Sequence, residues 1–263
     1  MIAAFSKNLV TPFTKTDKRV LFVILIVEWF LFALYWQMNA GELVPKPVGI
    51  FGQLSKILVS DYFYQNLLTS IILTFKAMFF ATIIALVVSY SYLMGLFKPI
   101  VQFMVVLRYL PLTGIIFVFS FMWPNGSDLK LMLLLFGIVP FFVTGMVSAI
   151  DSINPQLYDL CKTLRMNRWQ TLLRVVIKGE FHYVFEVIRQ NFAICWLMIT
   201  MVEGLSMSEG GIGTILIKQN KTLNLDYIFA IQATLFLFGV GFDFLLRFLR
   251  DRLFKFVPLQ RIK

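Results

Sequence analysis

Long, uninterrupted runs of apolar side chains restrict the fold of this chain more than any other feature. A helix needs about 20 apolar residues to cross the hydrocarbon core of a bilayer, and several runs of that length are separated here by short polar stretches. A backbone in lipid must satisfy its own hydrogen bonds, which leaves helices and closed barrels. These runs are too long for barrel strands and do not alternate with a period of two. The sequence therefore predicts an all-α, polytopic membrane helix bundle.

Six membrane spans are expected. Their approximate bounds are 20–38, 67–93, 105–123, 129–150, 183–202 and 227–246. Charged residues make up only 14% of the chain, against about 25% in soluble domains. We expect the first run to be retained as a span, because it is longer than a signal-peptide core and no small-x-small cleavage pattern follows it at once.

Basic residues lie mainly on one side of these spans. If the N-terminus is inside, the segments 1–19, 96–108, 151–182 and 247–263 face the cytoplasm and hold seventeen of the 24 Lys and Arg residues. The opposite loops hold five, namely Lys46, Lys56, Lys130, Lys218 and Lys221. This asymmetry follows the positive-inside rule, so both termini are predicted to be cytoplasmic.

The net charge of +10 reflects the same asymmetry. On a soluble protein it would favour a nucleic-acid partner, but on this chain none is expected. The predicted organisation is an N-terminal cytoplasmic segment 1–19, a transmembrane domain 20–246 that includes a cytoplasmic loop 151–181, and a basic cytoplasmic tail 247–263. We expect the tail to lie against anionic lipid headgroups through Arg247, Arg250, Arg252 and Lys255.

Residues with catalytic or metal-binding chemistry are sparse. The single histidine, His182, cannot build a two-histidine zinc site. The two cysteines, Cys161 and Cys195, fall on the cytoplasmic side and within a span, so no disulfide is expected between them. The sequence has no HExxH or GxSxG motif and no GxxxxGK[ST] phosphate loop. We therefore expect no catalytic residue, metal or cofactor, and an intramembrane enzyme is disfavoured.

The loop 151–181 has the pattern of two short helices. Asn154 followed by Pro155 is typical of an N-cap with proline at the first helical position. Asn167 can cap a second helix, with Gln170 as its capping-box partner. Apolar residues recur at i, i+3, i+4 and i+7 in both helices. They are Leu157, Leu160, Cys161 and Leu164 in the first, and Trp169, Leu172, Leu173 and Val176 in the second.

Periodicity alone leaves two interpretations of this loop open. Either the helices pack beneath the protein's own bundle, or they present their apolar faces to a cytoplasmic partner. In the second case a groove on the partner would take the apolar stripe. Polar side chains such as Tyr158, Asp159 and Lys162 would then fix its orientation.

A motif runs through this loop as Asp159-Leu160-Cys161, then Arg165, then Arg168-Trp169-Gln170. It resembles the Glu-Ala-Ala motif, the following glycine and the Arg-Trp-Gln stretch of permease subunits of ABC importers, nearest the nitrate/sulfonate/taurine group. Arg165 replaces the family's glycine and would be strained if that turn requires a positive φ. Ile177-Lys178 replaces a Leu-Pro pair of the family, so a helix-breaking proline is absent there.

Further motifs extend the resemblance to roughly residues 40–255. Pro45 and Pro47 lie where the family has a Leu-Pro-x-Pro stretch before its second span. Arg108-Tyr109-Leu110-Pro111 resembles an Arg-x-(Ile/Leu)-Pro motif of its third span. Val202-Glu203-Gly204, followed by residues 209–213, resembles a segment rich in Glu and Gly after its fifth span.

The resemblance implies the permease subunit of an ATP-driven importer, multi-pass in the cell inner membrane. It implies that this chain is not an enzyme, because ATP is hydrolysed by a separate cytoplasmic ABC ATPase. An extracytoplasmic solute-binding protein is a further implied partner, and a second copy of the chain is the simplest way to surround a path. The residues expected to dock the ATPase are Leu157, Tyr158, Asp159, Leu160, Cys161, Lys162, Thr163, Leu164, Arg165 and Arg168.

The translocation path is expected beside the outer end of the fifth span. Charges within spans are costly and tend to be functional, and Glu203 is the first candidate. Gly210, Gly211 and Gly213 permit an irregular backbone segment at membrane depth. The alternatives are that Glu203 lies in interfacial water and that the glycines form a plain outside loop.

Other charges within the spans are less distinctive. Glu28 and Lys76 are weaker candidates for a role in transport, and Lys76 can pair with a carboxylate or extend to the interface. Glu186 and Arg189 are three residues apart and are expected to form a local pair.

Other classes of membrane protein stay open at this stage. An ion-gradient-driven secondary transporter or a channel would predict an inverted internal repeat, and none is evident. A purely structural membrane subunit is a further alternative. The sequence does not identify the solute, because no cluster of intramembrane arginines marks an anion site.

Overall fold

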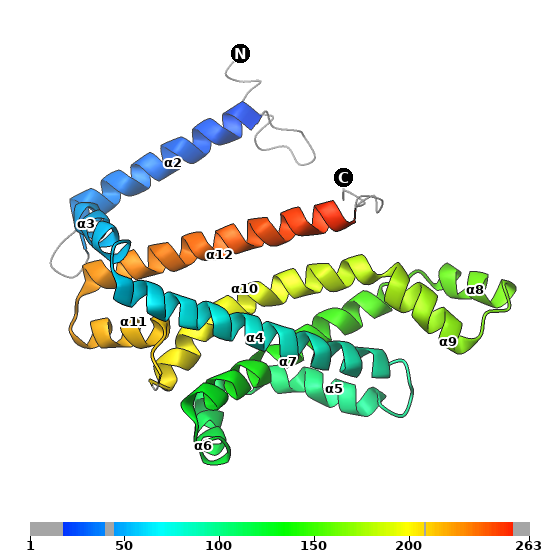
Figure 1. The fold of residues 1–263 in the computed structure, drawn as a ribbon. Helices are drawn as coiled ribbons and strands as arrows, with labels where there is room; N and C mark the ends of the chain where they lie inside the picture. Colours follow the sequence, from blue (N-terminus) through cyan, green and yellow to red (C-terminus); the bar gives the residue numbers. More distant parts are fainter. Residues whose placement is uncertain (1–17, 40–44, 208, 255–263) are drawn as a thin grey trace.

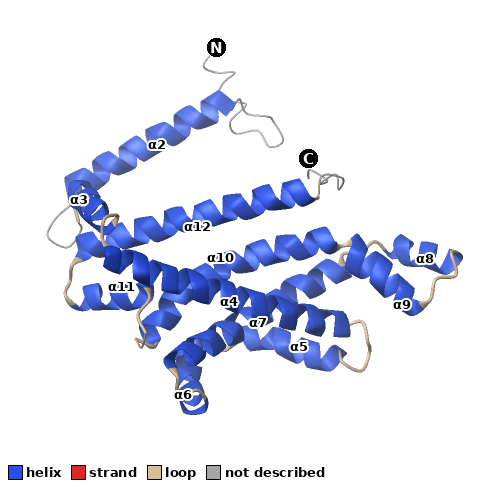
Figure 2. Cartoon of the chain, viewed as in Figure 1, coloured by secondary structure: helices blue, strands red, loops and turns tan. Residues whose placement is uncertain are grey.

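The computed structural model describes residues 18–39, 45–207 and 209–254, and every regular element within them is helical (Figure 2). The predicted all-α class is confirmed. Most of the predicted segment 1–19 and the end of the predicted tail 247–263 lie outside the described residues.

Five helices are long and apolar enough to cross a membrane, and each overlaps a predicted span. They are α2 (Lys18–Asn39), α4 (Asp61–Ser91), α7 (Gly126–Asp151), α10 (Phe181–Leu205) and α12 (Leu225–Leu253). Two helix bounds differ from the predicted spans by more than three residues. α4 begins at Asp61 instead of residue 67, with a carboxylate in its first turn that suits the helix dipole. α12 continues past residue 246, and its Arg250 pairs with Glu186 of α10.

The third predicted span, 105–123, is wrong as a straight helix. The chain forms α5 (Lys98–Val106), a 3₁₀ turn η1 (Leu107–Tyr109) and α6 (Leu112–Met122), and the two halves meet at 111°. Pro111 causes the break, because it has no N–H to donate and pushes the preceding residue out of the helical region. Leu110 is accordingly extended, with φ −83° and ψ 121°.

α4 and α7 run in the same direction. Near their starts, Lys130 Nζ of α7 donates to the Gly210 carbonyl, and the next residue, Gly211, donates its N–H to Asn66 of α4. At their ends, Ile150 packs in one cluster with Tyr90. Two parallel spans joined in sequence require a return crossing between them, and the bent pair α5–α6 provides it (Figure 1). With the bent pair counted as one span, the part of the chain that the structure describes holds six candidate spans, the number predicted.

Short helices gather at the two ends of the bundle. α3 (Pro47–Ile57) and α11 (Ile212–Lys221) lie at one end, near the start of α12 (Figure 1). α8 (Pro155–Thr163), α9 (Arg168–Thr171) and the π-helix η2 (Leu172–Gly179) lie at the other. Phe254, the last described residue, is at the end that holds α8 and α9. Because the C-terminus and the loop 151–181 are predicted to be cytoplasmic, we call that end the inner end and the α3–α11 end the outer end.

The core lies between α4, α7 and α10. It is built from side chains with no exposed surface, such as Phe63, Leu133, Ile138 and Phe142, together with Ile199. α2 stands apart from this core (Figure 1), and none of its most apolar stretch is buried by the described residues. The bundle that positions the functional ends is therefore complete without α2.

Candidate functional site

The loop at the inner end, residues 154–179, is here called the helical loop. Its first helix starts as predicted, because the Asn154 side chain accepts a hydrogen bond from the Gln156 N–H at 3.0 Å and Pro155 occupies the first turn. Its second helix also starts as predicted. Gln170 Oε1 accepts from the N–H of Asn167 at 3.0 Å, which completes a capping box.

The turn that ends α8 carries a left-handed residue. Met166 N–H donates to the Cys161 carbonyl at 2.9 Å, and Arg165 N–H donates to the Lys162 carbonyl at 3.0 Å. This pair of bonds defines a Schellman motif, whose C′ position is usually glycine. Arg165 occupies that position with φ 51°. The turn therefore does require a positive φ, and the arginine adopts it at a conformational cost.

The predicted apolar face of α8 divides between two environments. Cys161 faces inward and is 4% exposed. The leucines at 157, 160 and 164 are exposed by 38%, 52% and 63%. The second helix divides similarly, since Val176 is buried while Trp169 is 60% exposed. The loop thus packs on the bundle with one set of side chains and leaves a second apolar set uncovered by the described residues.

The inward side chains anchor the helical loop to the spans. Val176 forms a small buried cluster with Ile150 and Ile153, which lie at and after the end of α7, and Tyr158 and Tyr90 pack against it. Burial raises the pKa of Tyr158, with a further contribution from Glu180. Beside this cluster a cavity of about 610 Å³ separates the loop from the end of α4. The loop is therefore attached along one edge and only loosely supported elsewhere.

Polar residues of the predicted docking set lie on the solvent-exposed surface of α8. Lys162 Nζ donates to Asp159 at 2.8 Å, and both side chains are largely exposed, by 78% and 70%. This hydrogen bond raises the pKa of Lys162. The Thr163 hydroxyl donates to the Asp159 carbonyl. The charges of Asp159 and Lys162 are therefore accessible on α8.

The second predicted group of residues meets at the outer end, in a segment called here the glycine turn (residues 209–213). Glu203 has no exposed surface. Its carboxylate accepts hydrogen bonds from the Ser70 hydroxyl at 2.6 Å and from the Gly213 N–H at 2.9 Å. Because Gly213 lies in the first turn of α11, the carboxylate satisfies a helix N-terminus, where an anion is favourable.

Two further residues of α4 and α7 hold the glycine turn. Asn66 Oδ1 accepts from the Gly211 N–H at 2.7 Å, and Lys130 Nζ donates to the Gly210 carbonyl at 2.8 Å. Ser70 links both sides, because its hydroxyl oxygen also accepts from the Ile212 N–H at 3.0 Å. The turn is thus bound to three spans at once.

Glycine is required at position 211 for two reasons. Its φ is 107°, which side-chain-bearing residues rarely adopt. A Cβ there would also lie 2.5 and 2.6 Å from the two carboxylate oxygens of Glu203. The buried Glu203 carboxylate therefore fills the space that a side chain at position 211 would need.

Sequence reasoning identified Glu203 and the glycines but missed their partners. Lys130 was counted with the outside loops although it stands at the start of the predicted span 129–150. The count is wrong, because Lys130 lies in α7 and is 3% exposed. Asn66 lay just before the predicted start of the second span at residue 67, and Ser70 lay within the first turn of that span. Their spacing of four residues, which places two polar side chains on one helix face, was the available signal.

A third polar cluster joins α10 and α12 near the inner end. The predicted pair of Glu186 and Arg189 is confirmed, with Arg189 bonded to the Glu186 carboxylate. Arg189 also pairs with Asp243, and Arg250 pairs with Glu186 at 2.7 Å. Since two cations and two carboxylates share this cluster, their charges balance within it.

Comparison with known proteins gives a consistent result. A family model described as the binding-protein-dependent transport system inner membrane component matches residues 63–255. A putative ABC transporter permease protein of Methanocaldococcus jannaschii is 22% identical over 238 residues, which cover 87% of each chain.

Solved structures share the fold. A chain of an amino acid ABC transporter crystallised with histidines superposes with a TM-score of 0.66 at 16% identity, over 76% of this chain and 97% of that one. A chain of a bacterial ABC transporter involved in the import of the acidic polysaccharide alginate gives a TM-score of 0.58, also at 16% identity, over 89% and 96%. A second alginate transporter structure, in complex with an alginate pentasaccharide-bound periplasmic protein, gives 0.54 at 15% identity, over 89% and 93%.

Proposed function

Because the chain belongs to the family of binding-protein-dependent transport system inner membrane components, we propose that it is the permease subunit of an ATP-driven importer and docks a separate ABC ATPase through the helical loop. Membership of this family makes it a multi-pass membrane transport protein. ATP hydrolysis then belongs to the partner, and the permease supplies the solute path. The inner end faces the cytoplasm, and the membrane is the cell inner membrane.

The observation that carries the docking proposal is the uncovered apolar stripe of α8. Leu157, Leu160 and Leu164 project from a loop outside the spans, where water rather than lipid would meet them. Exposed leucines side by side on one helix favour an interface over a solvated surface. A helix of this kind binds by laying its apolar face into a groove. The charged pair Asp159–Lys162 would then lie at the rim.

The connections of the helical loop support a coupling role. The π-helix η2 leads from α9 almost directly to α10, with a single turn residue, Glu180, between them. The same element is fixed to the end of α7, because Val176 of η2 packs with Ile150. A displacement of the loop by an ATPase would therefore act on two spans of the core.

The outer end would meet the remaining partners. An extracytoplasmic solute-binding protein would deliver solute near α3 and α11, as the periplasmic protein of the alginate transporter complex suggests by analogy. A second copy of the chain would complete the path. Glu203, Gly210, Gly211 and Gly213 are proposed to border that path. The burial of Glu203 favours a positioning role for its carboxylate over direct contact with the solute.

The identity of the solute stays open. The resemblance to the nitrate/sulfonate/taurine group remains a prediction, because the comparisons reach ABC permeases without reaching that group. Two of the solved structures belong to transporters named for chemically unrelated solutes, amino acids and the acidic polysaccharide alginate. Solute class therefore requires a binding measurement with the cognate solute-binding protein.

Co-purification tests the docking proposal. The tagged chain is produced together with a candidate ABC ATPase from the same genome, and the ATPase retained after affinity purification is measured together with the ATP hydrolysis rate. Burying a leucine contributes about 1.5–3 kcal/mol, so we expect Leu160→Glu to reduce retention at least ten-fold. Leu160 is 52% exposed, so the variant should fold normally.

Gln156→Glu is the matched control. It adds the same negative charge to the same helix, one turn before Leu160, at an exposed position that is not one of the leucines, and its side chain can still face Asn154. Retention should remain at the level of the unmodified chain. Equal retention by both variants would contradict docking through this stripe, and loss in both would indicate an effect of charge alone.

A further inference from the structure

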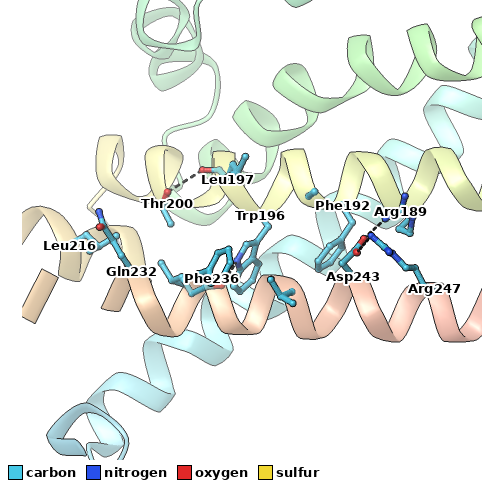
Figure 3. A pocket seen from close by; sticks show the side chains of 14 residues that line it. Arg189, Phe192, Trp196, Leu197, Thr200, Leu216, Gln232, Phe236, Asp243 and Arg247 are labelled. Atoms are coloured by element: carbon cyan, nitrogen blue, oxygen red, sulfur yellow. Dashed lines mark hydrogen bonds and ion pairs between the residues drawn. The ribbon is translucent and has the colours of Figure 1, made fainter. Parts of the chain in front are cut away.

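A groove of about 630 Å³ runs between α10 and α12 along the side of the bundle (Figure 3). Its walls are apolar over most of its length and are formed by Phe192, Trp196, Leu197, Leu235, Phe236 and Val240. At its inner end the groove reaches the charged side chains of Arg189, Asp243 and Arg247. It is separate from both the helical loop and the glycine turn.

Trp196 and Gly239 create the floor of the groove. The indole N–H of Trp196 donates to the Leu235 carbonyl at 3.1 Å, which draws the ring onto α12. A Cβ at position 239 would lie 3.1 Å from this ring, so glycine lets the indole approach the helix backbone. The ring is 8% exposed, whereas Leu197 and Phe236 at the rim are 75% and 69% exposed. The groove is therefore a fixed depression with an open apolar rim.

The groove is long enough to hold a lipid tail. Its lining on α12 extends from Gln232 to Arg247. At about 1.5 Å per residue this distance is roughly 22 Å, which exceeds the thickness of about 15 Å of half the hydrocarbon core. An acyl chain of the inner leaflet therefore fits within the groove along its whole length.

An exposed arginine lies where the headgroup of such a lipid would be. Arg189, Arg247 and Arg250 pair with Glu186, Asp243 and Asp251, so these six charges balance. Arg247 contacts Asp243 at 2.8 Å, but its side chain is 57% exposed and lines the groove. The exposed side of its guanidinium is therefore accessible to an anionic group from the membrane.

We propose that the groove binds one phospholipid of the inner leaflet, with an acyl chain on Trp196 and Phe236 and an anionic headgroup on Arg247. Apolar walls along the membrane normal match the tail, and a guanidinium at headgroup depth matches a phosphate or a second anionic group. The lipid would hold α10 and α12 together beside their ion-pair cluster. This site does not depend on the ATPase or on the identity of the solute.

Native mass spectrometry of the full chain in detergent tests the site. Phosphatidylglycerol and phosphatidylcholine are added separately at equal concentration, and the fraction of chain that retains one lipid is measured. The unmodified chain should retain phosphatidylglycerol several-fold more than phosphatidylcholine. Arg247→Gln should lower phosphatidylglycerol retention several-fold, to the level of phosphatidylcholine, and leave phosphatidylcholine unchanged.

A second variant fills the groove without removing a charge. Ala193 lines the groove from α10 and is exposed, so Ala193→Phe should occupy the space of the tail and reduce retention of both lipids about ten-fold. Arg252→Gln removes an exposed arginine that does not line the groove and should behave as the unmodified chain. Each variant is first checked for unchanged thermal unfolding in detergent alone.

Lipid binding should also raise the unfolding temperature of the chain, because a ligand that binds only the folded state stabilises it. Phosphatidylglycerol should raise it for the unmodified chain and for Arg252→Gln, and not for Ala193→Phe. Unchanged lipid retention in Ala193→Phe would overturn the proposal. Loss of a dimer in that variant, with lipid retention unchanged, would assign the groove to a subunit interface instead. Equal retention of both lipids by the unmodified chain would overturn the headgroup assignment.

Discussion

At the outer end of the bundle, left-handed backbone passes through Glu209, Gly210 and Gly211, and at the inner end it passes through Arg165. Glu209 is exposed, but from Gly211 onward the outer turn is buried, and side chains from three spans bond to Gly210, Gly211 and Gly213. The inner turn is exposed and relies on two backbone hydrogen bonds of its own helix. Glycine is needed where tertiary contacts leave no room for a Cβ. A strained arginine is tolerated where only the local backbone pays about 1–2 kcal/mol.

The substitution expected to have the largest effect on stability is Gly211→Ala at the outer turn. Alanine at this position must adopt a positive φ, and its Cβ must displace the Glu203 carboxylate from its hydrogen bonds. Together these effects should cost on the order of 4 kcal/mol. The measurement is chemical or thermal unfolding of the chain purified in detergent.

Gly52→Ala provides the matched control for that substitution. Gly52 lies within α3, and a Cβ there would meet nothing within 4 Å. The same chemical change should therefore stabilise the protein by about 0.5–1 kcal/mol. If both alanines had the same effect, the glycine turn would not be constrained in the way described.

Glu203→Gln should have the next largest effect. The amide keeps one acceptor, but its NH₂ group cannot accept from the Ser70 hydroxyl or the Gly213 N–H. Loss of one charge-assisted bond in a buried site should cost about 2 kcal/mol of unfolding free energy. Glu209→Gln, an exposed residue of the same turn, should be neutral, and an equal loss there would assign the effect to net charge.

Arg165→Gly at the inner turn should have the opposite sign. Glycine adopts the left-handed C′ position without strain, so α8 should gain about 1 kcal/mol. Amide hydrogen exchange across residues 155–171 is the most direct readout, with slower exchange expected. Arg168→Gly, within α9, should speed exchange instead. Slower exchange in both variants, or in neither, would contradict the assigned backbone conformation.

The smallest effect is expected for Asp159→Asn. The pair of Asp159 and Lys162 is exposed to solvent, and exposed pairs contribute little and are screened by salt. Unfolding should be unchanged within error at any salt concentration. A measurable loss of stability would mean that the surface of α8 is more constrained than that of a free docking helix.

Features that depend on a few adjacent residues could be predicted from the sequence. The caps at Asn154 and Asn167, the number of crossings and the Glu186–Arg189 pair each follow from a pattern within one helix or one turn. The strain expected at Arg165, if its turn required a positive φ, was also a local prediction, since the C′ position depends only on the helix that it ends.

Features that depend on distant partners could not. Ser70 and Glu203 are 133 residues apart, and no local pattern indicates that a carboxylate near the end of one span satisfies the start of a helix ten residues later. The burial of Lys130 was missed for the same reason. The bend at Leu110–Pro111 had a visible cause in the proline, but an angle of 111° is set by how α5 and α6 pack on α7 and not by the proline alone.

Because α2 stands apart from the core, substitutions in this helix can reveal which of its sides contacts another molecule. None of its most apolar stretch is buried by the described residues, and the family match begins only at residue 63. Exchange of one apolar residue for another on any side of α2 should therefore be silent in the isolated chain. In cells, a saturation scan of α2 would divide its circumference into tolerant and intolerant sectors. The intolerant sector, and the position of Glu28 relative to it, would map where another molecule presses against this span.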